Sequence, residues 1–107
     1  MKHLGPIGLT FFISTTVVLP ALAQDGDAGA GLTVAQDTCA GCHAIRKGQQ
    51  SATANAPAFE KIADVPGMTA IALQASLQTS HRSMPNLILS AEDRRNVVAY
   101  ILSLKPR

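Results

Sequence analysis

The sequence has 107 residues, a formal net charge of +2 and 47% hydrophobic residues, with three Phe, one Tyr and no Trp. This length suits a single domain and excludes a multidomain enzyme or a repeat array. The weak charge and the lack of a basic tract argue against nucleic acid as a partner. Beyond residue 23, only Phe59 and Tyr100 are aromatic. A domain this small has a marginal core and usually needs an additional stabilising element.

Residues 1–23 have the pattern of an export signal. Lys2 gives a positive start, an apolar stretch covers residues 9–19, and a small-residue cleavage site ends at Ala23. An uncleaved anchor is the alternative, but a spanning helix needs about 20 apolar residues, roughly twice this stretch. We therefore predict a signal peptide cleaved after Ala23. A domain of residues 24–107 would then reach the periplasm with no transmembrane anchor.

The mature chain has helical patterning throughout. Apolar residues recur at spacings of three and four, and helix caps are expected at Asp27, Thr69 and Ser90. No window alternates with the period of two that is typical of a strand. The fold class is therefore predicted as all-α, with helices at about Ala28–Cys39, Pro57–Ala63, from Thr69 to about Leu77, and from Ser90 to about Leu104.

One short motif carries recognisable chemistry. Cys39, Cys42 and His43 form a C-x-x-C-H string, which contains both cysteines of the sequence. Such a string is typical of c-type haem attachment. Two thiols three positions apart can each add to one haem vinyl group, and the adjacent imidazole can bind the iron. The motif predicts one covalently bound haem c, with His43 as an iron ligand.

Three other interpretations of the cysteine pair fit less well. A thioredoxin-like pair belongs at a helix start within a βαβ unit, whereas this pair closes a predicted helix. A disulfide between Cys39 and Cys42 would constrain little of the unfolded chain. A zinc site needs four ligands, and His43 and His81 are the only further candidates after residue 23.

The second axial ligand has three candidates in the mature chain. Met84 precedes Pro85, which disfavours helix at Met84 and stiffens the loop that carries its side chain. Met68 has the context of a methionine filling a gap in the core. His81 lies three residues before Met84 and could bind the iron instead. We favour Met84, because haem iron in electron carriers is often held by His and Met.

The pattern resembles the class I c-type cytochromes of bacteria over about Asp27–Lys105. Gly31 stands where that family has a helix-crossing glycine, and Tyr100 looks like the aromatic residue that packs there. Ala35 departs from the family, which usually has Phe or Tyr at this place. The Gly31–Tyr100 packing is therefore expected to be looser, or compensated by another residue.

This resemblance implies a small cytochrome c fold of three to four helices around one covalently bound haem. It also implies a role for Pro57, whose backbone carbonyl would accept a hydrogen bond from Nδ1 of His43. The haem-binding residues expected from the motif and the resemblance together are Cys39, Cys42, His43, Pro57 and Met84. His43 and Met84 would be the iron ligands, and no catalytic residue is expected.

The predicted function is that of a periplasmic one-electron carrier, a monomer that exchanges electrons with other redox proteins and is not an enzyme. Two alternatives remain open. The first is an electron-accepting subunit of a periplasmic dehydrogenase. The second is a haem peroxidase or gas sensor, which would need a labile bond between Met84 and the iron.

Overall fold

The computed structural model describes residues 26–79, 81 and 83–107, together with residues 5, 8, 14 and 15. The proposed signal cleavage site lies outside these residues. Within the described part, the only strand-like pairing is an isolated bridge between His81 and Met84, which confirms the all-α class. The elements are α1 (Ala28–Val34), the π-helical turn η1 (Ala35–Cys39), α2 (Phe59–Ala63), α3 (Ala70–Gln78) and α4 (Ala91–Ser103).

The first predicted helix forms, but its second half is wider than an α-helix. Asp27 caps α1, since its side chain accepts a hydrogen bond from the Ala30 amide at 2.8 Å. Further on, the Ala40 amide bonds to the Ala35 carbonyl at 2.9 Å, five residues back. Cys39 is the last residue of this π-helical turn, so the turn sets where its side chain lies at the end of the helix.

The two later caps form as predicted, and one predicted helix start is wrong. Thr69 Oγ1 accepts from the Ala72 amide at 3.2 Å, and Ser90 Oγ accepts from the Asp93 amide at 3.0 Å. Pro57, in contrast, does not open α2, which begins two residues later at Phe59. The physical reason is that the Pro57 carbonyl is bonded to a side chain outside the helix.

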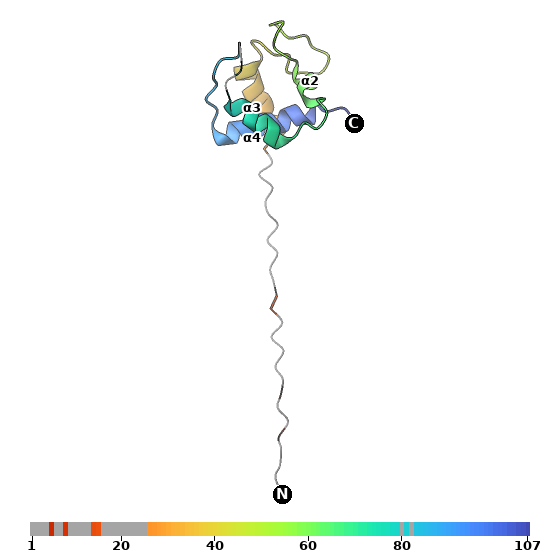
Figure 1. Cartoon of the computed structure of the whole chain (residues 1–107), viewed down its shortest axis with the longest axis vertical. Coiled ribbons are helices and arrows are strands. Elements are labelled where there is room, and N and C mark those ends of the chain that lie inside the picture. The colour runs from red at the N-terminus through yellow and green to blue at the C-terminus, as the bar shows by residue number, and fades with distance from the viewer. Residues whose placement is uncertain (1–4, 6–7, 9–13, 16–25, 80, 82) are drawn as a thin grey trace.

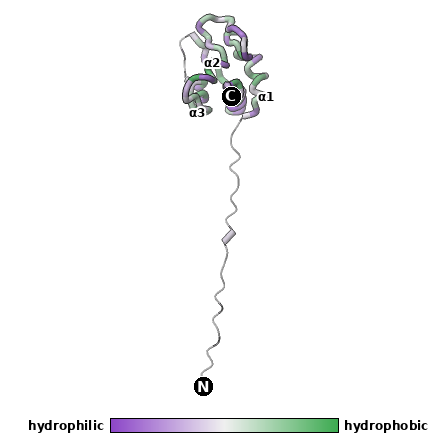
Figure 2. The backbone as a smooth tube through the Cα atoms, turned by 90° about the vertical axis from the view of Figure 1, so that its right-hand side faces the viewer, coloured by the Kyte–Doolittle hydropathy of each residue, from purple (hydrophilic) through white to green (hydrophobic). Residues whose placement is uncertain are grey.

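The helices pack around α4, which contacts α1, α2 and α3 (Figure 1). In the view of Figure 2, α1 and α3 lie on opposite sides of the C-terminal end of the chain. None of the helices in the described part is both long and apolar enough to cross a bilayer.

The tightest contact in the domain is the crossing of α1 and α4 at Gly31. A Cβ on Gly31 would lie 1.9 Å from the Asn96 carbonyl oxygen and 2.9 Å from Cβ of Tyr100. Next to the crossing, the Asp27 amide donates to Oδ1 of the buried Asn96 at 2.8 Å. Only glycine permits this approach of the two backbones.

The core compensates for the small Ala35 with an aromatic residue from another helix. Ala35 is fully buried, and the ring of Phe59 on α2 lies 6.4 Å from that of Tyr100. Tyr100 is therefore packed against an aromatic ring, although α1 and η1 supply none. The buried hydrophobic cluster comprises Ala35, Cys39, Ile45, Phe59, Ala63, Leu73, Val97, Val98, Tyr100, Ile101 and Leu104.

We expect Gly31→Ala to destabilise the protein by about 3 kcal/mol, the upper end of the usual cost of overpacking. The added methyl group would force α1 away from the Asn96 carbonyl. Gly41→Ala is the matched control, since nothing lies within 4 Å of a Cβ placed there. Denaturant unfolding of both variants measures the effect, and equal midpoints would contradict the close crossing.

Candidate functional site

A single cavity brings together all five residues predicted to bind haem. It has a volume of about 380 Å³, and Cys39, Cys42, His43, Pro57 and Met84 all line it. This volume is within the range typical of sites for small molecules and cofactors. Cys39, Cys42 and His43 belong to one stretch of chain, whereas Met84 comes from the segment between α3 and α4.

The walls of this cavity are mainly apolar. They come from all four α-helices or the segments that flank them, so that the fold as a whole encloses the space. The apolar lining includes Ala56, Phe59, Ile62, Met68, Leu73, Leu77, Pro85, Leu87, Val97 and Ile101. Hydroxyl and amide groups contribute at Thr38, Thr53, Asn55, Ser76 and Ser83. Such a lining suits a mostly apolar molecule with a few polar groups.

The two cysteines face the cavity from different environments, and both are free thiols. Cys39 is buried at the end of η1, and this burial raises the pKa of its thiol. Cys42 is exposed in the turn that follows. Among the described residues, no group of three or more His, Cys, Asp or Glu side chains is arranged to hold a metal ion.

His43 is fixed by a hydrogen bond and by a ring contact. Its Nδ1 lies 2.7 Å from the Pro57 carbonyl oxygen, as the resemblance implied. A carbonyl can only accept, so Nδ1 carries a proton, and in the neutral imidazole the free lone pair is then on Nε2. The His43 ring centroid also lies 5.5 Å from that of the buried Phe59. The imidazole is thus held in one tautomer.

The chain on either side of His43 is bonded to residues 51–59, which we call the clamp segment. The Thr53 amide donates to the Cys42 carbonyl at 3.2 Å, and the Phe59 amide donates to the Ala44 carbonyl at 2.9 Å. The Ala44 amide in turn donates to Oγ of Ser51 at 2.9 Å. With the Pro57 carbonyl, four residues of the clamp segment hold the three positions from Cys42 to Ala44.

A further bond ties this region to the last helix. The Tyr100 hydroxyl donates to the Ile45 carbonyl at 2.5 Å, and both residues are buried. Tyr100 also packs against Phe59 through its ring. The exit of the C-x-x-C-H motif is therefore anchored to α4 as well as to the clamp segment.

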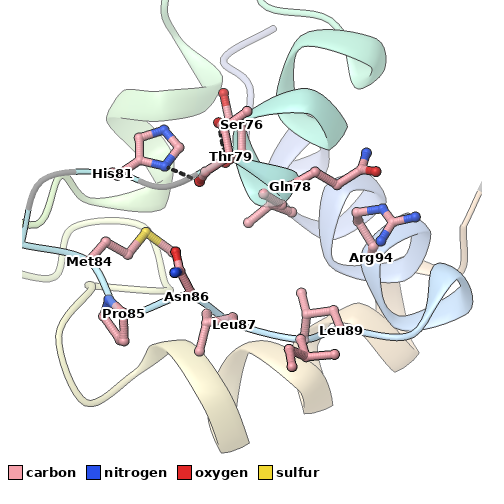
Figure 3. Close-up of a pocket in the computed structure, with 12 residues that line it drawn as sticks. Ser76, Gln78, Thr79, His81, Met84, Pro85, Asn86, Leu87, Leu89 and Arg94 are labelled. Carbon is pink, nitrogen blue, oxygen red and sulfur yellow. Dashed lines mark hydrogen bonds between the residues drawn. The ribbon is translucent and has the colours of Figure 1, made fainter.

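Met84 is carried by a tight turn that begins at His81. The Met84 amide donates to the His81 carbonyl at 3.3 Å, and Ser83 within this turn has a positive φ of 70°. A left-handed conformation is unfavourable for a residue with a side chain, so the turn holds Ser83 there at a cost of about 1 kcal/mol. Figure 3 shows Met84 beside Pro85 and Asn86 on the extended stretch that leads to α4.

The two other candidate ligands also line the cavity. His81 is exposed, and its Nδ1 lies 2.9 Å from the Thr79 carbonyl oxygen, which leaves Nε2 available. Met68 is half-buried and packs against the hydrophobic cluster, as expected for a core methionine. Met84 and His81 therefore remain the two side chains to compare as ligands.

Sequence patterns did not indicate two polar side chains near the site. In the sequence, Ser51 looks like an ordinary serine of a polar loop. Its hydrogen-bond partner is the Ala44 amide, seven residues earlier, and no sequence pattern predicts this pairing. Arg94 lies in the first half of α4, where charged side chains usually face solvent, but it is half-buried beside a neighbouring pocket of about 410 Å³ (Figure 3). Its Nε is buried without a hydrogen-bond partner.

Comparison with known proteins gives two matches. The profile of a family described as "Cytochrome C oxidase, cbb3-type, subunit III" matches residues 25–101. A protein named cytochrome c-552 from Bradyrhizobium diazoefficiens is 34% identical over 104 residues, which cover 97% of each chain. No solved structure shows a significant match.

We expect Tyr100→Phe to lower the free energy of unfolding by about 2 kcal/mol, because the buried Ile45 carbonyl loses its partner. The ring contact with Phe59 is retained in this variant. Ser103→Ala, which removes a hydroxyl that donates to the Tyr100 carbonyl from an exposed residue of the same helix, should change stability by about 0.5 kcal/mol or less. Equal losses in the two variants, measured by denaturant unfolding, would contradict the role given to the Tyr100 hydroxyl.

Proposed function

This chain belongs to the class I c-type cytochromes, and we propose that it carries single electrons between redox proteins in the periplasm. Members of this family bind haem c covalently. When bound, haem c supplies an iron that cycles between the ferrous and ferric states. The signal pattern of residues 1–23 supports export with cleavage after Ala23, so that residues 24–107 form the mature protein.

This proposal rests on the side chains that line the cavity. Cys39 and Cys42 supply two thiols for thioether bonds, and His43 adds an imidazole from the same stretch of chain. Met84 adds a thioether sulfur from a separate segment. These donors and the apolar walls are the chemistry that a covalently attached haem requires.

Each of these residues has a distinct part in the proposed function. The thiols of Cys39 and Cys42 would fix the position of the cofactor, and His43 Nε2 would bind its iron. The Pro57 carbonyl sets the tautomer and the orientation of the His43 imidazole. Met84 would supply the second protein ligand of the iron, which favours a raised reduction potential. The apolar walls of the cavity would keep water away from the bound group.

Carrier function is favoured over catalysis because both axial positions would be filled by protein side chains. A peroxidase or a gas sensor would need one of them to open. Met84 is carried by a turn that is closed by the bond between its amide and the His81 carbonyl, and Pro85 follows it directly. This stiffness argues for a permanent ligand, and therefore for an electron-transfer protein rather than an enzyme.

Replacing both Cys39 and Cys42 with Ala should abolish covalent attachment of haem, because no other thiol is present in the chain. Haem staining after denaturing electrophoresis measures this attachment. Gly41→Ala, between the two cysteines, keeps both thiols and should keep the haem. Retention of haem by the double variant through denaturation would exclude the proposed thioether bonds.

Met84→Ala should remove the weak near-infrared charge-transfer band of the sulfur–iron bond and allow external ligands to bind the iron. Met68→Ala is the matched control, since Met68 also brings a sulfur to the cavity wall. The band should persist in the Met68 variant and in His81→Ala. If His81→Ala opened the iron to external ligands and Met84→Ala did not, His81 would be the axial ligand.

A further inference from the structure

We propose that Ser51 is a positioning residue for His43, and that its hydroxyl tunes the reduction potential through the clamp segment. This inference rests on the proposed function, in which His43 binds the iron. It goes beyond that function because it assigns a role to a side chain that lies outside the C-x-x-C-H motif, the proline and the methionine loop. Ser51 is half-buried at the start of the clamp segment.

The first step is the bond between Ser51 and the residue that follows His43. Ser51 Oγ accepts from the Ala44 amide at 2.9 Å. Ala44 is only 4% exposed, so water has little access to this residue. If the hydroxyl were removed, the amide would be left without its partner in a buried position, which the backbone can avoid only by moving.

A movement of the Ala44 backbone would also affect the His43 imidazole, because both are bonded to the clamp segment. Ser51 and Pro57 belong to the same clamp segment, and Pro57 holds Nδ1 of His43 at 2.7 Å. The Thr53 and Phe59 amides complete the attachment at the Cys42 and Ala44 carbonyls. The clamp segment and residues 42–44 are thus joined at four points, so that a shift at Ala44 changes how the His43 ring meets the Pro57 carbonyl.

Ser51 is the residue of the clamp segment whose hydrogen bond a substitution can remove. Thr53, Pro57 and Phe59 contribute backbone atoms, which remain after any ordinary substitution. Ser51 contributes a side-chain oxygen, which Ala lacks and Thr retains. The pair Ser51→Ala and Ser51→Thr therefore separates the hydrogen bond from the rest of the segment.

The expected effect has a definite direction. The bond to the Pro57 carbonyl makes the His43 imidazole a stronger electron donor, and a stronger donor favours the ferric state. Loosening this bond weakens donation to the iron. Removal of the Ser51 hydroxyl should therefore raise the reduction potential while Met84 remains bound.

The experiment compares the holoprotein with Ser51→Ala, Ser51→Thr and, as control, Gln50→Ala, which removes an exposed side chain from the adjacent position. Spectroelectrochemical titration gives the midpoint potential, and electron paramagnetic resonance of the ferric protein reports the imidazole–iron bond. We expect a raised midpoint and altered g-values in Ser51→Ala only. The near-infrared sulfur band should be present in all four proteins.

A purely structural role for Ser51 gives a different result. Ser51→Ala would then unfold at lower denaturant concentration but keep the midpoint potential and g-values of Gln50→Ala, which would overturn the proposal. If Ser51→Ala does not accumulate, Ser51→Val replaces it, because Val has nearly the shape of Thr but no oxygen that can accept from the Ala44 amide. A higher midpoint in Ser51→Val than in Ser51→Thr supports the proposal, and equal midpoints overturn it.

The same measurements distinguish this inference from the function on which it rests. A wild-type protein whose ferric spectrum lacked histidine ligation would overturn the proposed function and the role of Ser51 together. A histidine-ligated wild type whose midpoint does not respond to Ser51→Ala would overturn the role of Ser51 alone.

Discussion

The approach of α1 to α4 at Gly31 is the contact on which the rest of the structure depends. The two backbones meet so closely there that no side chain fits between them. From this crossing, α1 continues through η1 to Cys39, while α4 supplies Val97 and Ile101 to the cavity wall. A single steric condition therefore sets the distance between the thiols and the opposite side of the site. It also explains why a chain with so few large residues builds a defined pocket.

Because of this crossing, α4 contributes both to the hydrophobic core and to the site around His43. One set of its residues contributes to the hydrophobic cluster, and Tyr100 reaches the Ile45 carbonyl just beyond the C-x-x-C-H motif. His43 is then positioned from both sides, by the clamp segment and by α4. The part of the site around His43 is thus built from bonds between nearby residues, and the contact between α1 and α4 holds this part in place. Met84, by contrast, depends on its own turn and on the stretch that leads to the Ser90 cap.

The site residues that can be predicted from the sequence are those that a short local pattern marks. Cys39, Cys42 and His43 form a motif, and Met84 is marked by the proline that follows it. The caps at Asp27, Thr69 and Ser90 follow from side-chain chemistry that acts over three residues, and the structure confirms them.

Other features depend on contacts between distant residues and leave no local pattern. Pro57 lies outside α2 because its carbonyl is bonded to His43, fourteen residues earlier. The pairing of Ser51 with Ala44 and the burial of Arg94 likewise arise only when the chain has folded. The π turn before Cys39 is also invisible to a pattern of apolar residues, which predicts helix there without specifying its width.

The segment from Arg46 to Gln50 separates two anchored parts of the chain and has a consequence for redesign. Its residues are exposed, and Gly48 turns it with a φ of 73° while its amide bonds to the Glu60 carboxylate at 3.0 Å. Ile45 before it and Ser51 after it are held independently. Lengthening a flexible loop costs only about 0.6 kcal/mol for each doubling. This exposed turn is therefore a suitable place to insert a peptide, such as an affinity tag or a surface-attachment sequence, close to the C-x-x-C-H motif without changing the bonds that hold His43.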